Sequence, residues 1–246
     1  MSDWEEKLPS RVRERLNQVG QIKSAFQPGL TLEDFQKAVQ QRKKEKGISF
    51  VLALYQVLDE FVAEEIKNSG VVLACKKGCS YCCYQMIACT KIEMDEIVKF
   101  VDGLPRPIRI PLLRRIRGFV SQWRDYFGRN EFSLKINSLK VYEDWHGKPC
   151  PFLNESDGSC DVYPVRIIDC RTASSLISCG SGIKGDWIIP TPLYEKKPGR
   201  CRFQSELWAN NLILEEEQRR VGLADPRLVQ VTPLHHWLWM RRKELS

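Results

Sequence analysis

Apolar residues recur at intervals of three and four over several stretches of the chain, which predicts amphipathic helices. The clearest stripe follows Gly47 and should end at Asn68-Ser69-Gly70; it consists of Phe50, Leu54, Leu58, Phe61 and Val62. Residues 10–19 are charged and also compatible with a helix. Helix starts are expected at Thr31 and at Thr90, because a capping hydroxyl precedes acidic residues in both places.

Further helices are predicted in the second half of the chain. Prolines at 105, 107 and 111 should break the chain before an amphipathic helix from Leu112 to Phe127. Helical sequence returns after Arg202, and Thr232-Pro233 predicts a cap for a last helix from His235 to Lys243. His235 and His236 point in different directions on a helix, and the tryptophans beside them favour packing over metal binding or proton transfer.

The middle of the chain has a different character. Residues 145–202 are rich in Gly, Pro, Ser and Cys, and only short extended pieces are expected there. We therefore predict a mainly α fold, in which helices flank an irregular, cysteine-rich metal-binding module with short extended segments. The parts are residues 1–70 as a helical scaffold, 71–204 as the module and 205–246 as a helical extension, together forming one compact body.

Composition narrows the class of protein. The 246 residues are 43% hydrophobic and 28% charged, which is near the globular average. The first residues resemble no secretory signal, and charged residues interrupt the most apolar stretch, Ile48 to Ile66, so we expect a cytoplasmic protein without a membrane span. The net charge of +7 favours acidic partners or anionic ligands.

Arginine is concentrated between Arg106 and Arg129, where seven arginines accompany one acid, Asp125. A phosphate backbone could bind such a stretch, but no recognition motif for nucleic acid accompanies it. The arginines also form the polar stripe expected of a solvated helix packed on a core. We therefore expect a protein partner or protein substrate rather than nucleic acid.

Ten cysteines carry the candidate chemistry. In a reducing compartment, clustered thiols are more often ligands or catalysts than disulfides. Four of them form a C-x3-C-x2-C-C string, whose short gaps let thiolates converge on one centre: Cys75, Cys79, Cys82 and Cys83. Because adjacent side chains point about 100° apart on a helix, Cys82 and Cys83 should not easily fill two corners of one tetrahedron, and one of them could serve a different ion.

A second group of cysteines is dispersed: Cys150, Cys160, Cys170, Cys179 and Cys201. Prolines on both sides hold Cys150 extended, and the turn signal Asp157-Gly158 could fold Cys160 back towards it. Four thiolates on a divalent ion carry excess negative charge. Arginines near these cysteines could offset that charge, above all Arg166 and Arg171, with Arg200 and Arg202 also nearby.

These residues together resemble the YkgJ-type cysteine-cluster family, described as a zinc- or iron-chelating domain, over roughly residues 71–203. The resemblance rests on the first cysteine string, on Pro149-Cys150-Pro151-Phe152-Leu153, and on Cys160 to Arg171, where Ile167 replaces a family proline. It implies eight ligands: Cys75, Cys79, Cys82, Cys83, Cys150, Cys160, Cys170, and either Cys201, which we prefer, or Cys179. Cys89 has no role in this pattern.

The spacing bears on which metal is bound. Tetrahedral zinc holds its sulfurs only about 3.8 Å apart, whereas the outer sulfurs of a cuboidal cluster lie wider. C-x3-C-x2-C suits three corners of a 4Fe-4S cluster, and no clean second C-x2-C pair marks a zinc site. We therefore favour an iron–sulfur cluster over zinc, although two four-thiolate zinc sites would also use eight cysteines.

Three functions follow from this site. The first is an iron–sulfur protein with a redox or structural role, and the second a zinc-stabilised interaction module. The third is an S-adenosylmethionine-dependent enzyme. The three-residue first gap resembles flagellin lysine-N-methylase, which would imply methyl transfer to a protein lysine, and it also resembles the radical type, whose alternating strands and helices the chain lacks. We favour the first function, since little is present beyond the module and helices.

Overall fold

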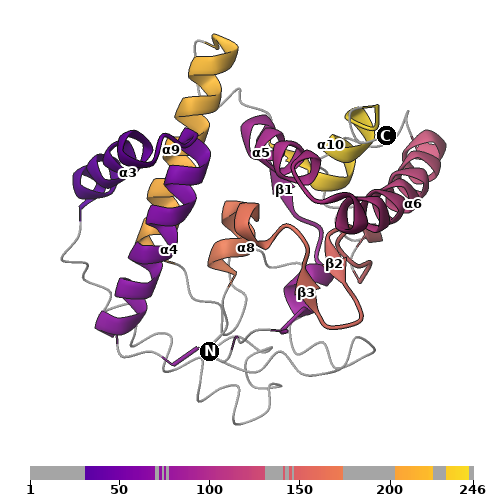
Figure 1. The fold of residues 1–246 in the computed structure, drawn as a ribbon, viewed down its shortest axis with the longest axis horizontal. Helices are drawn as coiled ribbons and strands as arrows, with labels where there is room; N and C mark the ends of the chain where they lie inside the picture. The colour runs from indigo at the N-terminus through magenta and orange to yellow at the C-terminus, as the bar shows by residue number, and fades with distance from the viewer. Residues whose placement is uncertain are drawn as a thin grey trace, which may run out of the picture.

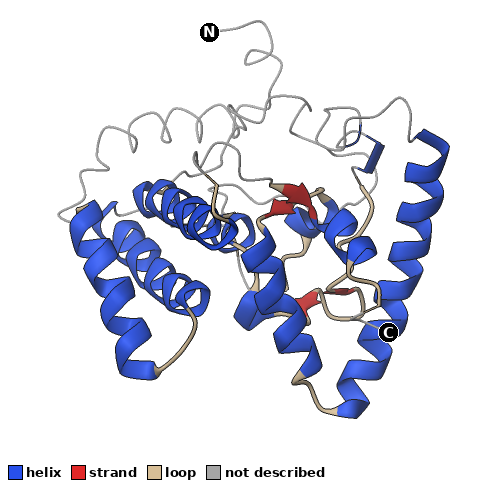
Figure 2. Ribbon diagram, turned by 90° about the horizontal axis from the view of Figure 1, so that it is seen from above, coloured by secondary structure: helices blue, strands red, loops and turns tan. Residues whose placement is uncertain are grey.

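The computed structural model describes residues 31–69, 72–73, 75, 78–130, 141, 144–145, 147–173, 203–223 and 231–243. Seven α-helices make up most of the regular structure in these ranges, and the strands are short and paired two by two (Figure 2). This confirms the predicted mainly α fold. The helix expected over residues 10–19 lies outside the described residues.

The first two helices of the described residues pack against each other at one side of the molecule (Figure 1). Helix α3 (Leu32–Lys46) begins at the predicted Thr31, whose hydroxyl accepts a hydrogen bond from the Asp34 N–H at 3.2 Å. The Asp34 carboxylate in turn accepts from the Thr31 N–H, which completes a capping box. The left-handed Gly47 ends α3, and helix α4 (Phe50–Ser69) then ends where Asn68-Ser69-Gly70 predicted.

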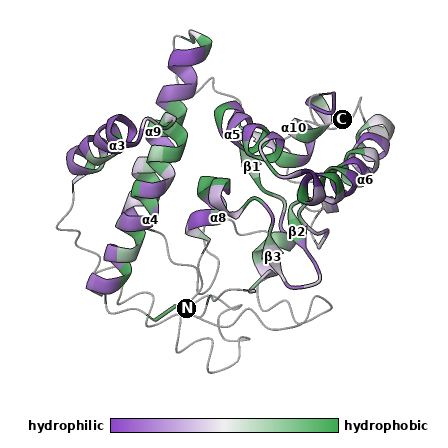
Figure 3. Cartoon of the chain, in the orientation of Figure 1, coloured by the Kyte–Doolittle hydropathy of each residue, from purple (hydrophilic) through white to green (hydrophobic). Residues whose placement is uncertain are grey.

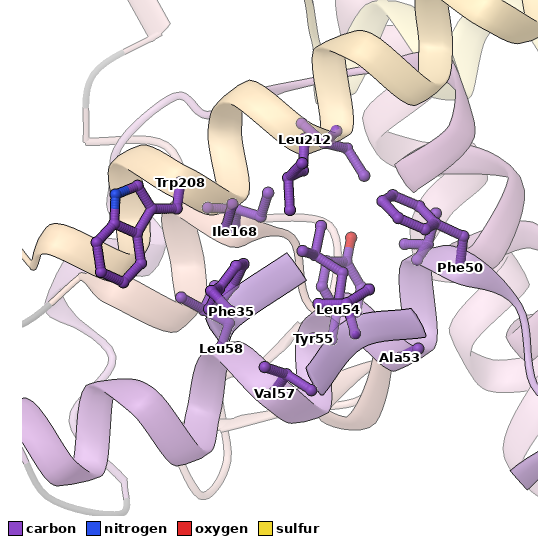
Figure 4. Packing of buried hydrophobic residues seen from close by; sticks show 14 of the residues in the cluster. Phe35, Phe50, Ala53, Leu54, Tyr55, Val57, Leu58, Ile168, Trp208 and Leu212 are labelled. Atoms are coloured by element: carbon purple, nitrogen blue, oxygen red, sulfur yellow. The ribbon is translucent and has the colours of Figure 1, made fainter. Parts of the chain in front are cut away.

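Helix α9 (Gln204–Val221) packs against α3 and α4 although it is far away in the sequence. Glu65 of α4 accepts hydrogen bonds from the N–H groups of Gln204 and Ser205 at 2.8 and 2.9 Å, so a buried carboxylate caps α9 from another helix. The apolar faces of these helices form a first core, part of which Figure 4 shows: Phe35, Phe50, Leu54, Leu58, Trp208 and Leu212.

A second group of helices consists of α5 (Lys91–Asp102), α6 (Arg106–Asn130) and α10 (Leu234–Met240), which lie on the other side of the molecule (Figure 1). The predicted capping box at Thr90 is present, because Glu93 accepts from the Thr90 N–H at 3.0 Å. Glu93 also accepts from the N–H of Ile168 at 3.1 Å. One buried carboxylate therefore ties the start of α5 to the irregular segment that carries Cys170.

Helix α6 corrects one prediction, since it begins at Arg106 and not at Leu112. Pro107 lies in the first turn, where a missing N–H costs nothing because that N–H has no acceptor within the helix. Pro111 lies further inside the helix and cannot bond to the carbonyl of residue 107. Both prolines are exposed, so water can serve that carbonyl instead.

Helix α10 corrects a second prediction. Thr232 and Pro233 form strand β4 (Thr232–Pro233), which pairs with β1 (Ala88–Cys89), so Thr232 does not cap the helix. Pro233 is the residue before the helix, and the helix ends at Met240 and not at Lys243. Pairing with β1 removes Thr232 from the capping position, and its buried hydroxyl has no hydrogen-bond partner among the described residues.

The histidines of α10 lie in an aromatic cluster with α6, as the packing interpretation predicted. The His235 ring is stacked on Trp123 with centroids 5.9 Å apart, and it lies 4.7 Å from the Trp145 ring. Burial, and after it the nearby charge of Lys148, lowers the pKa of His235 to about 3. His235 is therefore neutral near pH 7 and serves as part of the core.

The irregular segment lies between the two groups of helices. It contains two 3-10 turns, η1 (Tyr81–Tyr84) and η2 (Tyr163–Val165), the strands β2 (Leu153–Asn154) and β3 (Ser159–Cys160), and the short helix α8 (Ile168–Thr172). Ile168 of α8 is buried in the first core, whereas Val162 and Val165 are buried in the second core with α5 and α6. In the part of the chain that the structure describes, no helix is both long and apolar enough to span a bilayer.

Candidate metal centre

Contacts between four separate segments of backbone bring the cysteines together. The N–H of Cys150 donates a hydrogen bond of 2.7 Å to the carbonyl of Cys83, which joins the first cysteine string to the second group. Strands β2 and β3 then pair antiparallel with Leu153 opposite Cys160. Short α8 carries Cys170, and its segment is held by the Glu93 bond described above.

The predicted turn at Asp157-Gly158 is present and folds Cys160 back towards Cys150. The Gly158 N–H donates to the carbonyl of Asn154 at 2.9 Å, and the Asp157 carboxylate accepts from the Ser159 N–H at 2.9 Å. Gly158 has φ of 71°, a left-handed conformation that glycine adopts without strain. The turn therefore returns the chain as its sequence predicted.

Five thiols influence one another electrostatically, and we call them the five-thiol cluster: Cys82, Cys83, Cys150, Cys160 and Cys170. Burial is the first cause that raises the pKa of Cys150 to about 12, and the charges of Cys160 and Cys82 act in the same direction. Burial also raises the pKa of Cys170 well above its usual value, followed by the charges of Cys150 and Cys82. Burial raises the pKa of Cys160, and Cys82 contributes there too.

The adjacent pair Cys82 and Cys83 faces the same cluster. A hydrogen bond with Cys82 is the first cause that raises the pKa of Cys83, followed by burial and by the charges of Cys82, Cys150 and Cys170. Adjacent side chains point apart on a regular helix or strand, which led to the expectation that one of the two cysteines serves a different ion. Both residues lie in the 3-10 turn η1, where their thiols are neighbours. A separate ion at one of these two thiols stays a prediction.

The other predicted ligands are placed differently. Cys75 is half-buried and Cys79 is exposed. The backbone beside Cys79 is close to the cluster, because Gly78 packs against the Asp157-Gly158 turn that leads into Cys160. Cys179 and Cys201 lie outside the described residues, as do Arg200 and Arg202. Cys89 is buried in the second core, and the charges that raise its pKa, after burial, come from carboxylates and not from the five thiols.

The two arginines predicted near the thiolates have different surroundings. The charge of Arg166 lies close to Cys160 and opposes the rise of its pKa. Its guanidinium covers the Tyr163 ring at 4.1 Å, and its buried Nε has no hydrogen-bond partner in the part of the chain that the structure describes. Arg171 is buried and bonds to Asp59 at 2.5 Å and to the Pro164 carbonyl at 2.6 Å. Arg171 therefore fastens the Cys170 segment to α4, and its charge also lies near Cys170.

Arg115 of α6 is a neighbour of the cluster that the sequence analysis missed. Its Nε donates to the Pro151 carbonyl at 3.0 Å, and it forms an ion pair with Asp161. Its charge opposes the burial that raises the pKa of Cys150. The periodicity of the helix gave no signal for it, because at about 100° per residue Arg109 lies nearer to the apolar stripe of Leu112 and Ile116 than Arg115 does.

The thiol groups suit a soft metal, but they are neighbours and do not form a ready-made metal site. Thiolates are the ligands that zinc and iron–sulfur clusters use, and cationic groups such as Arg115 and Arg166 offset their charge. Across the described ranges, no three Cys, His, Asp or Glu side chains are arranged so that they could hold a metal ion as they stand. None of the eight described cysteines forms a disulfide.

Comparisons with protein-family models, with curated proteins and with solved structures find no match for this chain. The resemblance of the cysteine pattern to the YkgJ-type family is therefore an expectation from the residues alone. Any assignment of function must be argued from the placement of the thiols and their charged neighbours.

Proposed function

We propose that this chain is a metal-binding protein whose cysteines hold an iron–sulfur cluster of the 4Fe-4S type in a redox or structural role. The observation that carries the proposal is the five-thiol cluster itself. Four segments of the chain contribute to it, from η1 to α8, and these segments contain little regular structure of their own. Metal binding would stabilise such a segment, because the binding free energy of a structural metal is also folding free energy.

The alternative to a ligand role is that these cysteines are ordinary core residues. Cys150, Cys160 and Cys170 do pack against the second core. Their charged neighbours favour a ligand role instead, since neutral thiols in a core need no cation beside them. Arg115 and Arg166 both lie close to a thiol of the cluster, and the buried Arg166 Nε still has a hydrogen to donate. A thiolate-bound centre with excess negative charge would make use of both.

The spacing of the first cysteine string favours iron–sulfur over zinc. A tetrahedral zinc and a 4Fe-4S cluster each take four thiolates, so the five neighbouring thiols of the described residues suit both. The C-x3-C-x2-C gaps suit three corners of a cuboidal cluster, so we assign Cys75 and Cys79 to the centre together with Cys82. Zinc remains the alternative that the experiment must separate. We also propose a cytoplasmic protein, because thiols that form no disulfide suit a reducing compartment.

The test is a purification of the full chain without oxygen, followed by analysis of iron, acid-labile sulfide and zinc. The proposal expects brown protein with iron and sulfide in equal amounts and a paramagnetic signal after reduction by dithionite. A centre that dithionite does not reduce would point to the structural role. Stoichiometric zinc without sulfide would replace iron–sulfur by the zinc alternative.

The same samples test the enzyme alternative. The holoprotein is incubated with S-adenosylmethionine, and the products are separated by chromatography. Adenosylhomocysteine would indicate methyl transfer, and deoxyadenosine in the reduced sample would indicate radical chemistry. The proposed binding role expects neither product.

A further inference from the structure

Helix α6 carries most of the excess positive charge of the protein. It contains seven arginines and one acid, Asp125, whereas the whole chain has a net charge of +7. The helices α4, α5 and α9 each contain more acidic than basic residues. The colours of Figure 3 show strongly hydrophilic and hydrophobic residues side by side along α6. The charge is therefore concentrated in one element and not spread over the surface.

Three exposed arginines of α6 have no ionic partner in the described part of the chain: Arg106, Arg114 and Arg117. Other arginines of the described residues do have partners, as in the pairs of Arg42 with Glu60 and of Arg124 with Asp125. Arg114 and Arg117 are three residues apart on one helix, a spacing at which like charges repel each other. An acidic partner would relieve this repulsion.

An exposed apolar side chain lies among these arginines. Ile110 is 41% exposed, and at about 100° per residue it points between Arg117 and Arg114, one turn after Arg106. Protein interfaces combine apolar residues at the centre with arginine, which is enriched in them. A phosphate backbone would meet the arginines but would leave Ile110 without an apolar contact. The combination therefore favours a protein over nucleic acid.

The opposite side of α6 faces the five-thiol cluster. Arg115 on that side contacts Pro151 and Asp161, and its charge acts on Cys150. At about 100° per residue, Arg106 and Arg117 point roughly the other way from Arg115. An α-helix with its side chains is about 10–12 Å across, so only the width of this helix would separate a partner on the exposed face from the cluster.

We propose that the exposed face of α6 is a docking surface for an acidic protein that works with the metal centre. We call it the α6 docking face, and it consists of Arg106, Ile110, Arg114 and Arg117. The link to the metal centre rests on the proposed function. The contact itself needs only the charges and Ile110, so it can be measured separately from the metal.

The first experiment measures binding of fluorescent peptides to the full, anaerobically purified chain by anisotropy, at low and at physiological salt. One peptide is helical and built from glutamate and leucine, and the other is all glutamate and of equal length. The inference expects the first peptide to bind more tightly, with an affinity that falls as salt rises. Equal affinity of the two peptides would overturn the role of Ile110.

Charge reversal on two faces gives the matched comparison. Arg114→Glu with Arg117→Glu should weaken binding by about tenfold, because two attractive contacts become repulsive. Lys43→Glu with Lys44→Glu makes the same change of charge on exposed residues of α3 and should leave the affinity unchanged. Equal losses in the two double variants would show that only the net charge matters and would overturn the inference.

Two competing kinds of partner, nucleic acid and lipid, are tested with the same protein. If duplex RNA or phosphatidylserine vesicles bind through Arg114 and Arg117 more tightly than the glutamate–leucine peptide does, the partner is not an acidic protein and the inference is wrong. Iron and sulfide are measured on every preparation. Peptide binding by a chain without metal would leave the docking face standing while the proposed function fails. Metal without binding at α6 would do the reverse.

Discussion

Gly158 lies so close to the backbone of Gly78 that a Cβ atom on it would be 2.6 Å from the Gly78 carbonyl oxygen. The contact joins the loop of the first cysteine string to the turn that returns Cys160. Both glycines have positive φ, 84° at Gly78 and 71° at Gly158. A side chain at residue 158 would therefore meet a neighbour that consists of backbone and cannot rotate away.

Gly158→Ala should destabilise the protein. An alanine in the left-handed conformation costs about 1–2 kcal/mol, and the loss should be larger here because the clash with Gly78 adds to the backbone strain. It should also lower the metal content. Gly147→Ala is the matched control, since Gly147 has φ of 80° and open space at its Cβ. Urea unfolding and metal analysis check the pair. If both variants lose the same stability, the approach to Gly78 contributes nothing.

Cys170→Ser should lose most of the bound metal, because Cys170 belongs to the five-thiol cluster. Cys89→Ala should keep it, since the charges that act on the Cys89 thiol come from carboxylates and not from these five thiols. Iron and sulfide per folded chain are the readout, with circular dichroism as the check of folding. Retention of a full metal complement by folded Cys170→Ser protein would remove this thiol from the centre.

Arg115→Gln should lower the reduction potential of the centre. Reduction adds negative charge, and removal of a nearby cation makes the reduced form less favourable. We expect a shift of roughly 20–60 mV, which is about 0.5–1.4 kcal/mol for one electron. The neighbour Arg114→Gln should shift the potential much less, because Arg114 is exposed. Redox titration of both variants decides, and equal shifts would contradict a specific role of Arg115.

The stability of the protein should depend on pH through His235. Its pKa is lowered to about 3 in the folded state, whereas an unfolded histidine titrates near its ordinary value of 6.5. The unfolded state therefore binds more protons between these values, and stability falls as the pH decreases from about 6.5 towards 3. His235→Phe removes this dependence. The change in the free energy of unfolding that the substitution causes should therefore be more favourable at pH 5 than at pH 8, by about 2 kcal/mol.

Urea unfolding at pH 5 and pH 8 measures this difference. The lowered pKa of His236, about 4, adds a similar dependence to both proteins and cancels in the comparison. Parallel pH profiles of the wild type and of His235→Phe would show that His235 is not buried as a neutral ring.

The parts of this structure that could be predicted from the sequence are local. The capping boxes at Thr31 and Thr90 and the turn at Asp157-Gly158 each depend on side chains within three residues of the backbone they bond to. Such features form in the same way in many tertiary contexts. The predicted start of α6 at Leu112 is wrong, because a proline in the first turn leaves a helix intact and does not break it.

The parts that could not be predicted depend on distant residues. Glu65 caps α9 across an interval of more than a hundred residues, and Cys150 donates to the Cys83 carbonyl from a separate segment. The role of Arg115 depends on which side of α6 faces the cysteines, and the periodicity of the helix alone does not name its neighbour. The pairing of β1 with β4, which removes Thr232 from its cap, is equally non-local.

The most direct test of the account is X-ray absorption at the iron edge on the full chain purified without oxygen. We predict a first shell made of sulfur and a second shell of iron, because cysteine thiolates and bridging sulfides surround each iron of a cluster. A spectrum with nitrogen or oxygen neighbours and no iron–iron contact, or a sample that contains no bound iron although it is well folded, would contradict it.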